Sequence, residues 1–334
     1  AKLLERLCSS VVRMSGLGSA TGSSAHGASE AALARETKTS VAICLGILVV
    51  VGAVCVHLLA TSNAVEREPL LGETAAPAAV VLLFRLAAAL VKTRVLCLVV
   101  ADPVPFEVRY TVVGRPDIPM VHRNFYHSGR FTTFTLWCNS VAALYFWCSA
   151  GVSAGDLLLG GAPARLRSVA GVLWEITFPM AFLVNLVVTF VLIPMVKKQG
   201  ALEKLAIMLR WRPLVLHNGF VLMAACEAAL AAPQVRWSRL PSIVLFGLAY
   251  VLFAWGLWLK TGVFHYFFLD PRYAKAPLAL AALLLLLAGL YALGSLAISI
   301  AAESWAAKAA IVAAAACTCT WRDSALNGRQ HEKR

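Results

Sequence analysis

The sequence predicts an all-α protein, specifically a polytopic transmembrane helical bundle with six to eight spans. Hydrophobic residues make up 60% of the 334 residues and charged residues only 14%, against about 25% charged residues in an ordinary soluble domain. Apolar runs of about 20 residues, enough to cross a hydrocarbon core of about 30 Å, recur along the chain. Strict polar alternation, which a membrane β-barrel requires, is absent. This pattern excludes disordered, coiled-coil and secreted disulfide-rich proteins.

Six apolar runs are predicted to cross a membrane as helices, because lipid offers no water to unpaired backbone groups. They are residues 41–60, 131–152, 169–196, 213–232, 240–259 and 277–302. Two further runs are ambiguous because they contain basic residues. These are residues 79–101, with Arg85, Lys92 and Arg94, and the short run 306–321, with Lys308.

The net charge of +13 is explained by basic residues in loops on the cytoplasmic side of a membrane. That asymmetry holds if all eight runs cross and disappears if only six cross, which favours at least one ambiguous run as a span. No basic helix interleaved with aromatic residues predicts nucleic-acid binding. No cofactor or metal is predicted, because phosphate-binding loops and zinc-binding motifs are absent and the pair Cys317 and Cys319 lacks a second pair.

Four ionisable side chains lie inside predicted spans, where they cost several kcal/mol unless they are paired or line a wet cavity. They are His57, Glu175, His217 and Glu227. Interhelical hydrogen bonding is an alternative role for each, and for His57 and Glu175 it is the stronger expectation. His217 and Glu227 are ten residues apart in one predicted helix, so they project from nearly the same face. A partly desolvated neutral imidazole can take a proton from a hydroxyl.

A nucleophile on another helix would complete such a pair. The start of the 131–152 run offers Thr132, Thr133 and Thr135, followed by Asn139. Threonine hydroxyls in membrane helices commonly bond back to the preceding turn, which is the competing role for each of them. Ser153 lies in a G-x-S-x-G sequence, the nucleophile elbow of soluble esterases, but no strand precedes it as that motif requires. We therefore expect a coincidence there.

Several short motifs resemble, in order, those of the androgen-induced and androgen-dependent TFPI-regulating proteins. Residues 130–134, R-F-T-T-F, resemble the aromatic-x-Thr-Phe start of the second helix in that family, and residues 178–179 resemble the Phe-Pro of the third. His217 and Glu227 resemble a His and a Glu at the same spacing. Residues 258–270, W-L-K-T-G-V-F-H-Y-F-F-L-D, resemble the T-G-x-x-x-Y-P-F-L-(D/E) segment between the fifth and sixth helices.

The resemblance covers residues 125–302 and implies a multi-pass membrane enzyme that hydrolyses fatty acid esters of hydroxy fatty acids. Members of the family use an intramembrane threonine nucleophile and a histidine. Residue by residue, this implies Thr133 as the nucleophile, because Phe131 and Phe134 flank it, and His217 as its base. The implied partners are a lipid ester substrate and the bilayer, in the endoplasmic reticulum or the plasma membrane.

Four other side chains are candidates for supporting roles in that chemistry. Asn185 or Asn139 would donate to the developing oxyanion, and Glu227 or Asp270 would orient the imidazole. The chain departs from the family at Phe267, which stands where the family has Pro, and at Pro213-Leu214, where the family has Asn-His. These departures affect substrate preference more than the nucleophile.

The chain is thereby divided into four parts. Residues 1–40 are predicted to be a mobile arm rich in Ser, Gly and Ala, residues 41–124 hold additional or first transmembrane segments and a basic loop, residues 125–321 form the hydrolase core, and residues 322–334 are a polar C-terminal tail. A transporter or a non-catalytic membrane protein is the alternative function. Inverted repeats with broken helices would favour a transporter, and the sequence shows no self-similar halves.

Overall fold

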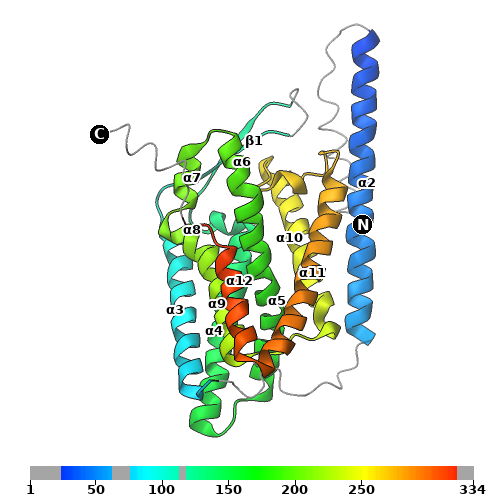
Figure 1. Cartoon of the computed structure of the whole chain (residues 1–334). Helices are drawn as coiled ribbons and strands as arrows, with labels where there is room; N and C mark the ends of the chain where they lie inside the picture. The colour runs from blue at the N-terminus through cyan, green and yellow to red at the C-terminus, as the bar shows by residue number, and fades with distance from the viewer. Residues whose placement is uncertain (1–23, 62–75, 113–117, 322–334) are drawn as a thin grey trace, which may run out of the picture. The chain divides into compact units, whose positions relative to one another are not determined.

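The computed structural model describes residues 24–61, 76–112 and 118–321, and it confirms the all-α transmembrane bundle (Figure 1). Within these ranges, six helical segments are long and apolar enough to cross a membrane, and they match the six predicted runs. They are Arg35–Thr61, Phe134–Leu159, Ala164–Lys198, Trp211–Ala231, Trp237–Thr261 and Ala276–Ala301. The protein is therefore an integral membrane protein.

The helices and strands follow one another along the chain with short connections. The elements are α2 (Ser24–Thr61), α3 (Ala78–Ala101), β1 (Phe106–Tyr110), β2 (Val121–Phe125), α4 (Phe134–Leu159), α5 (Ala164–Val187), α6 (Ile193–Lys198), α7 (Leu202–Met208), α8 (Trp211–Leu216), α9 (Asn218–Ala231), α10 (Leu240–Thr261), α11 (Ala276–Glu303) and α12 (Trp305–Cys317). A π-helical segment, Val188–Leu192, joins α5 to α6.

The described chain forms two compact units. One, the hairpin unit, consists of residues 24–57, 104–112, 118–126 and 244–285. The other, the helical unit, consists of residues 58–61, 76–103, 127–243 and 286–321. Each unit is described by itself below.

The prediction of a mobile arm over residues 1–40 is wrong for residues 24–40, because α2 already begins at Ser24. The stretch from 28 to 38 is rich in Ala, Leu, Glu, Arg and Lys, which are good helix formers. The apolar run that follows supplies a long helix, and extending an existing helix needs no new nucleus. Residues 1–23 and the predicted tail at 322–334 lie outside the described residues.

Helix α3 corresponds to the ambiguous run 79–101, and its charges explain the ambiguity. It has 24 residues, which gives about 36 Å of helix, the length of a span. It lies beside α4 and α9 in the helical unit (Figure 1). Arg85 and Lys92 are 2% and 0% exposed, so they face protein instead of lipid. A count of charges in the sequence cannot distinguish these two environments.

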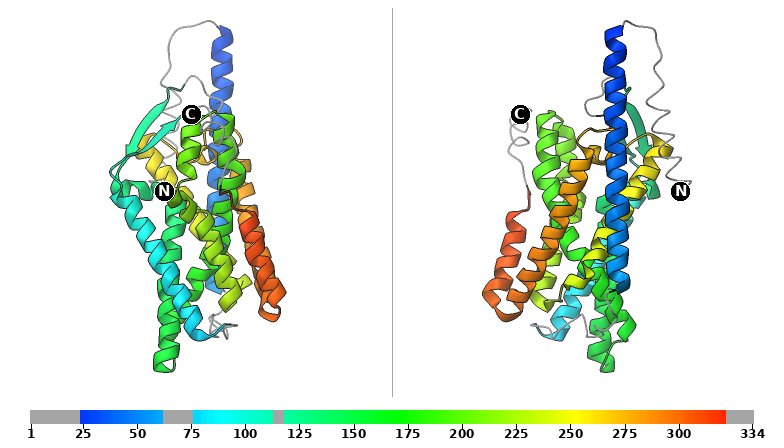
Figure 2. Two further views of the ribbon diagram at one scale, coloured as in Figure 1. Left: turned by 60° about the vertical axis from the view of Figure 1, so that its left-hand side comes forward. Right: turned by 90° about the vertical axis from the view of Figure 1, so that its right-hand side faces the viewer.

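Helix α12 is too short to be a second ambiguous span. Its 13 residues reach about 20 Å, well below a hydrocarbon core of about 30 Å. The chain turns back at Ser304, whose hydroxyl accepts a hydrogen bond from the Ala307 amide, and α12 then packs on α9 (Figure 2). Its C-terminal end is therefore held within the helical unit.

The predicted basic loop contains a two-stranded antiparallel sheet that the sequence reading missed. Strands β1 and β2 pair Phe106 with Phe125 and Tyr110 with Val121. Arg123 Nε of β2 donates to the carbonyl of Thr261 at the end of α10, at 2.9 Å. A pair of five-residue strands is too short to give a clear alternation in the sequence.

Candidate functional site

Three interruptions of helical structure meet in the helical unit. Helices α8 and α9 are separated by His217, whose backbone angles are φ −109° and ψ −72°. Beside this α8–α9 junction, Asn218 Nδ2 donates to the carbonyl of Thr320, just after α12, at 2.9 Å. Asn185 Nδ2, one turn before the π segment, donates to Thr318 Oγ1 at 2.8 Å. Irregular backbone within a membrane protein is tolerated where protein surrounds it, and π segments are common at functional sites.

The start of α4 is fixed to the same junction. Asn139 Nδ2 donates to the carbonyl of Leu216, the residue before His217, at 3.0 Å. One and a half turns earlier, Leu136 packs in an apolar cluster with Leu216 and with Val95 of α3. The structure therefore brings the predicted nucleophile segment and the predicted base segment side by side.

Thr133 occupies the N-cap position of α4, with φ −89° and ψ 143°, and its hydroxyl makes no capping hydrogen bond. Its side chain is half-buried. The neighbouring Thr132 behaves differently, because its hydroxyl donates to the carbonyl of Gly129 at 2.8 Å. Of these two adjacent threonines, only Thr132 spends its hydroxyl on the backbone of the preceding turn.

His217 lies half-buried at the junction, within electrostatic range of Lys92. No hydrogen bond joins the side chains of His217 and Thr133 in the part of the chain described here. Catalytic hydrogen bonds are often long without substrate and shorten in the substrate complex. The two side chains occupy neighbouring segments without a direct bond.

Lys92 is a polar contributor to this region that the sequence analysis treated only as a charge inside a span. Its ammonium donates to Asn139 Oδ1 at 2.5 Å and lies 4.2 Å from the centre of the Phe220 ring. Asn139 thus links Lys92 on one side to Leu216 on the other. A signal was present in the sequence: a lysine within an apolar run is expensive in lipid and so indicates a functional position.

Glu227 belongs to a separate polar cluster, which we call the Arg85 network. Its Oε1 accepts from Arg85 Nε at 2.9 Å and from Tyr145 at 2.6 Å. Arg85 Nη1 also donates to Ser153 Oγ at 2.6 Å. The expectation that His217 and Glu227 share a face assumed an unbroken helix, and the break at His217 removes that assumption. Ser153 is a structural acceptor here, as expected for a coincidental G-x-S-x-G.

The two asparagines predicted as oxyanion donors already use their N–H groups. Asn139 Nδ2 donates to the carbonyls of both Thr135 and Leu216, and Asn185 Nδ2 donates to the carbonyl and hydroxyl of Thr318. Both therefore position backbone in this structure. Asn185 Oδ1 and Thr189 Oγ1 are buried polar atoms without a hydrogen-bond partner among the described residues.

Asp270, the other predicted orienting carboxylate, lies in the hairpin unit. It is 0% exposed, accepts from Tyr110 and is paired with Arg272, whose Nη2 is 2.9 Å from Oδ2. Burial and the adjacent Asp270 carboxylate raise the pKa of Tyr110, which keeps that phenol protonated as the donor. Arg272 also lies over the Trp258 ring, at 4.8 Å. Asp270 thus organises the segment that resembles the family motif.

The other two intramembrane candidates occupy different surroundings. Glu175 is fully buried, and its Oε1 accepts from the backbone N–H of Arg236 at 3.2 Å, in the loop before α10. His57 is exposed on α2. Both placements agree with the expectation that neither belongs to a catalytic pair.

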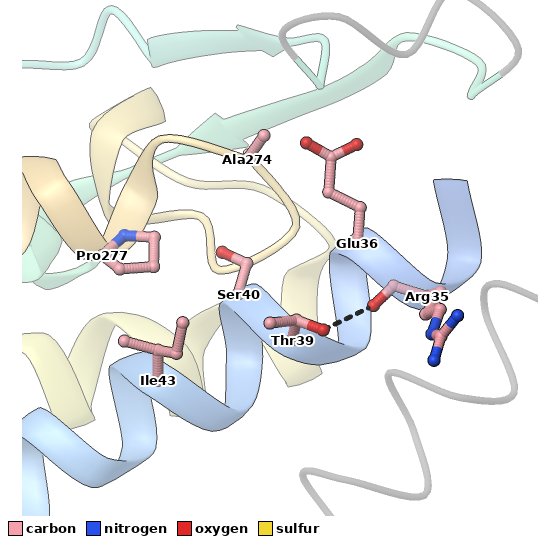
Figure 3. Close-up of a pocket in the computed structure, with 7 residues that line it drawn as sticks. All are labelled: Arg35, Glu36, Thr39, Ser40, Ile43, Ala274 and Pro277. Carbon is pink, nitrogen blue, oxygen red and sulfur yellow. Dashed lines mark hydrogen bonds between the residues drawn. The ribbon is translucent and has the colours of Figure 1, made fainter. Parts of the chain in front are cut away.

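A groove of about 480 Å³ lies in the hairpin unit, between α2 and the start of α11 (Figure 3). Its lining residues are Arg35, Glu36, Thr39, Ser40, Ile43, Ala274 and Pro277. Thr39 donates its hydroxyl to the carbonyl of Arg35 at 3.0 Å. None of the predicted site residues lines this groove, and it offers no histidine to activate a nucleophile.

Comparisons with protein-family models, with curated proteins and with solved structures find no match for this chain. The family resemblance stays a prediction from short motifs.

Proposed function

We propose that this protein hydrolyses lipid esters within the membrane, with Thr133 as nucleophile and His217 as its general base. The observation that supports the proposal most directly is the hydrogen bond from Asn139 to the carbonyl of Leu216. It holds the start of α4 against the α8–α9 junction and so places the threonine and histidine segments next to each other. The uncommitted Thr133 hydroxyl is consistent with this role.

The chemistry proceeds in two stages. His217 takes the proton of the Thr133 hydroxyl as its oxygen attacks the ester carbonyl, and the alkoxide leaves as an alcohol with that proton. Water, deprotonated by His217, then attacks the acyl-threonine and releases the fatty acid. The water-poor surroundings strengthen any dipole aimed at the developing oxyanion.

The proposed substrates are fatty acid esters of hydroxy fatty acids, in the endoplasmic reticulum or the plasma membrane. This substrate class comes from the resemblance of residues 125–302 to the androgen-induced and androgen-dependent TFPI-regulating proteins. In such esters the scissile carbonyl lies several carbons from the free carboxylate. Phospholipids carry their esters at the interface beside a charged head group, so we expect them to be poor substrates.

The test is ester hydrolysis by the full-length protein purified in detergent. Thr133→Ala and His217→Ala are expected to lower the rate at least about 100-fold, the size of a general-base contribution. Thr132→Ala is the matched control, because its hydroxyl is spent on the Gly129 carbonyl, and it should retain activity. Equal loss in Thr132→Ala and Thr133→Ala would contradict the assignment.

A competition assay tests the substrate class separately. Hydroxy fatty acid esters and phospholipids are presented together in mixed micelles at equal mole fraction. Preferential turnover of the hydroxy fatty acid esters is expected. Equal or faster phospholipid turnover would indicate a phospholipase instead.

One observation favours a transporter as the second candidate. The break at His217 and the half-length α12 are discontinuous helices, which transporters use to build substrate sites. Uptake of a fatty acid into vesicles that contain the protein, without any ester hydrolysis, would support this alternative.

A further inference from the structure

Lys92 is a buried cation that no carboxylate neutralises among the described residues. Its side chain is 0% exposed, and its only polar contact is the neutral amide oxygen of Asn139. The face of the Phe220 ring, 4.2 Å from Nζ, adds a weaker attraction. Charges inside a membrane protein are normally paired, and an intramembrane cation without a counter-ion indicates an ion or substrate site.

Burial alone does not distinguish Lys92, because Lys308 of α12 is also buried, with its Nζ 4.6 Å from the Trp305 ring centre. The two lysines differ in what surrounds them. Lys308 lies ten residues before Thr318, so along α12 it is about 15 Å from the end that reaches the α8–α9 junction. Lys92 is connected to the junction through Asn139 and interacts electrostatically with His217.

We propose that Lys92 binds the free carboxylate of a fatty-acid-type lipid and thereby positions that lipid at the α8–α9 junction. An ammonium has three donors, and Asn139 uses one of them. A carboxylate would supply the missing negative charge and accept charge-assisted hydrogen bonds from the others. The half-buried side chains of Thr133 and His217 leave the junction partly open, whereas Lys92 forms its closed end.

This inference rests on the proposed function for its meaning and adds a specificity rule to it. Thr133 and Asn139 are six residues apart, which is about 9 Å along α4. A lipid whose carboxylate reaches Lys92 would therefore present to Thr133 a group several methylenes further along its chain. Esters formed on a hydroxyl at that distance from the carboxylate are favoured over esters beside it.

The experiment measures binding without turnover. A pyrene-labelled fatty acid and the matching pyrene-labelled alcohol are titrated into the full-length protein in detergent. The wild-type protein is expected to prefer the acid by at least about tenfold, the effect of one charge-assisted contact. Lys92→Met should abolish that preference without weakening alcohol binding, Lys92→Arg should keep most of it, and Lys308→Met should leave it unchanged.

A wild-type protein that binds acid and alcohol equally, or a preference that persists in Lys92→Met, would overturn the carboxylate site. If Lys92→Met does not fold, carbodiimide coupling of oleic acid to the wild-type protein decides, because an amide at Lys92 supports the site and amides only at other lysines contradict it. Neither probe contains an ester, so the result does not depend on hydrolysis. A preference for the acid in a protein that cleaves no ester would refute the proposed hydrolase and keep the carboxylate site.

Discussion

Helix α3 carries two buried cations seven residues apart, two turns along one face, and their surroundings differ. Arg85 is neutralised by Glu227, at 2.6 Å, and supported by Ser153. Lys92 meets an amide oxygen and an aromatic ring, without a carboxylate among the described residues. The comparison indicates that the Arg85 network ties helices together, whereas the surroundings of Lys92 are completed only when an anionic ligand arrives.

The largest effect is expected from removing one partner of the Arg85 network. Arg85→Met leaves Glu227 as an uncompensated buried charge, which costs about 3–5 kcal/mol of unfolding free energy. Thermal unfolding of the protein in detergent measures this loss. The double variant Arg85→Met with Glu227→Leu removes both charges and should recover most of it. A single variant as stable as the wild type would show that the pair is dispensable.

A smaller effect is expected from Ser153→Ala. The variant removes an acceptor of Arg85 Nη1, and hydrogen bonds to charged groups contribute about 1.5–3 kcal/mol. The same unfolding measurement should show a loss in that range, and ester hydrolysis should persist. Loss of hydrolysis in a folded Ser153→Ala protein would restore the nucleophile-elbow interpretation.

Lys92→Met should change stability by less than about 1 kcal/mol. The variant loses one hydrogen bond to Asn139, worth about 1 kcal/mol, but it also removes a buried charge that no carboxylate compensates. Its unfolding is compared directly with that of Arg85→Met. A loss as large as that of Arg85→Met would mean that Lys92 serves stability in the same way.

The smallest effect concerns His265, a buried base that stays neutral, in contrast to the two cations. Burial lowers its pKa from 6.5 to about 4, and its ring lies 5.0 Å from that of Phe125. Between pH 6.5 and 4 the unfolded chain binds a proton that the folded chain excludes, so stability falls as the pH is lowered through this range. His265→Phe should show a weaker decrease in melting temperature between pH 7.5 and 5. An unchanged pH dependence would contradict burial of a neutral ring.

The sequence was sufficient for the long helices because apolar length is a local property. It was insufficient for α3, where three charges hid a helix whose Arg85 and Lys92 face protein partners. Those partners come from α4 and α9, and one sequence does not reveal such distant pairings. The helix break at His217 was missed for a related reason, since the 213–232 run reads as one continuous apolar helix.

The site shows the same division between local and distant information. Thr133 was distinguished from Thr132 in the sequence only by its flanking aromatic residues, whereas the structure separates them by hydrogen bonding. Asn139 was predicted as an oxyanion donor, but its contacts with Lys92 and Leu216 make it a positioning residue. Roles that depend on tertiary hydrogen bonds could not be assigned from spacing alone.

The most direct test of the central claim is covalent labelling of the full-length protein in detergent with an activated fluorophosphonate, followed by mass spectrometry of the labelled peptide. We predict modification of Thr133, with no labelling of Thr133→Ala or His217→Ala, while Thr132→Ala is labelled like the wild type. Modification of Ser153, or labelling of Thr133 that persists in a folded His217→Ala protein, would contradict the threonine–histidine pair.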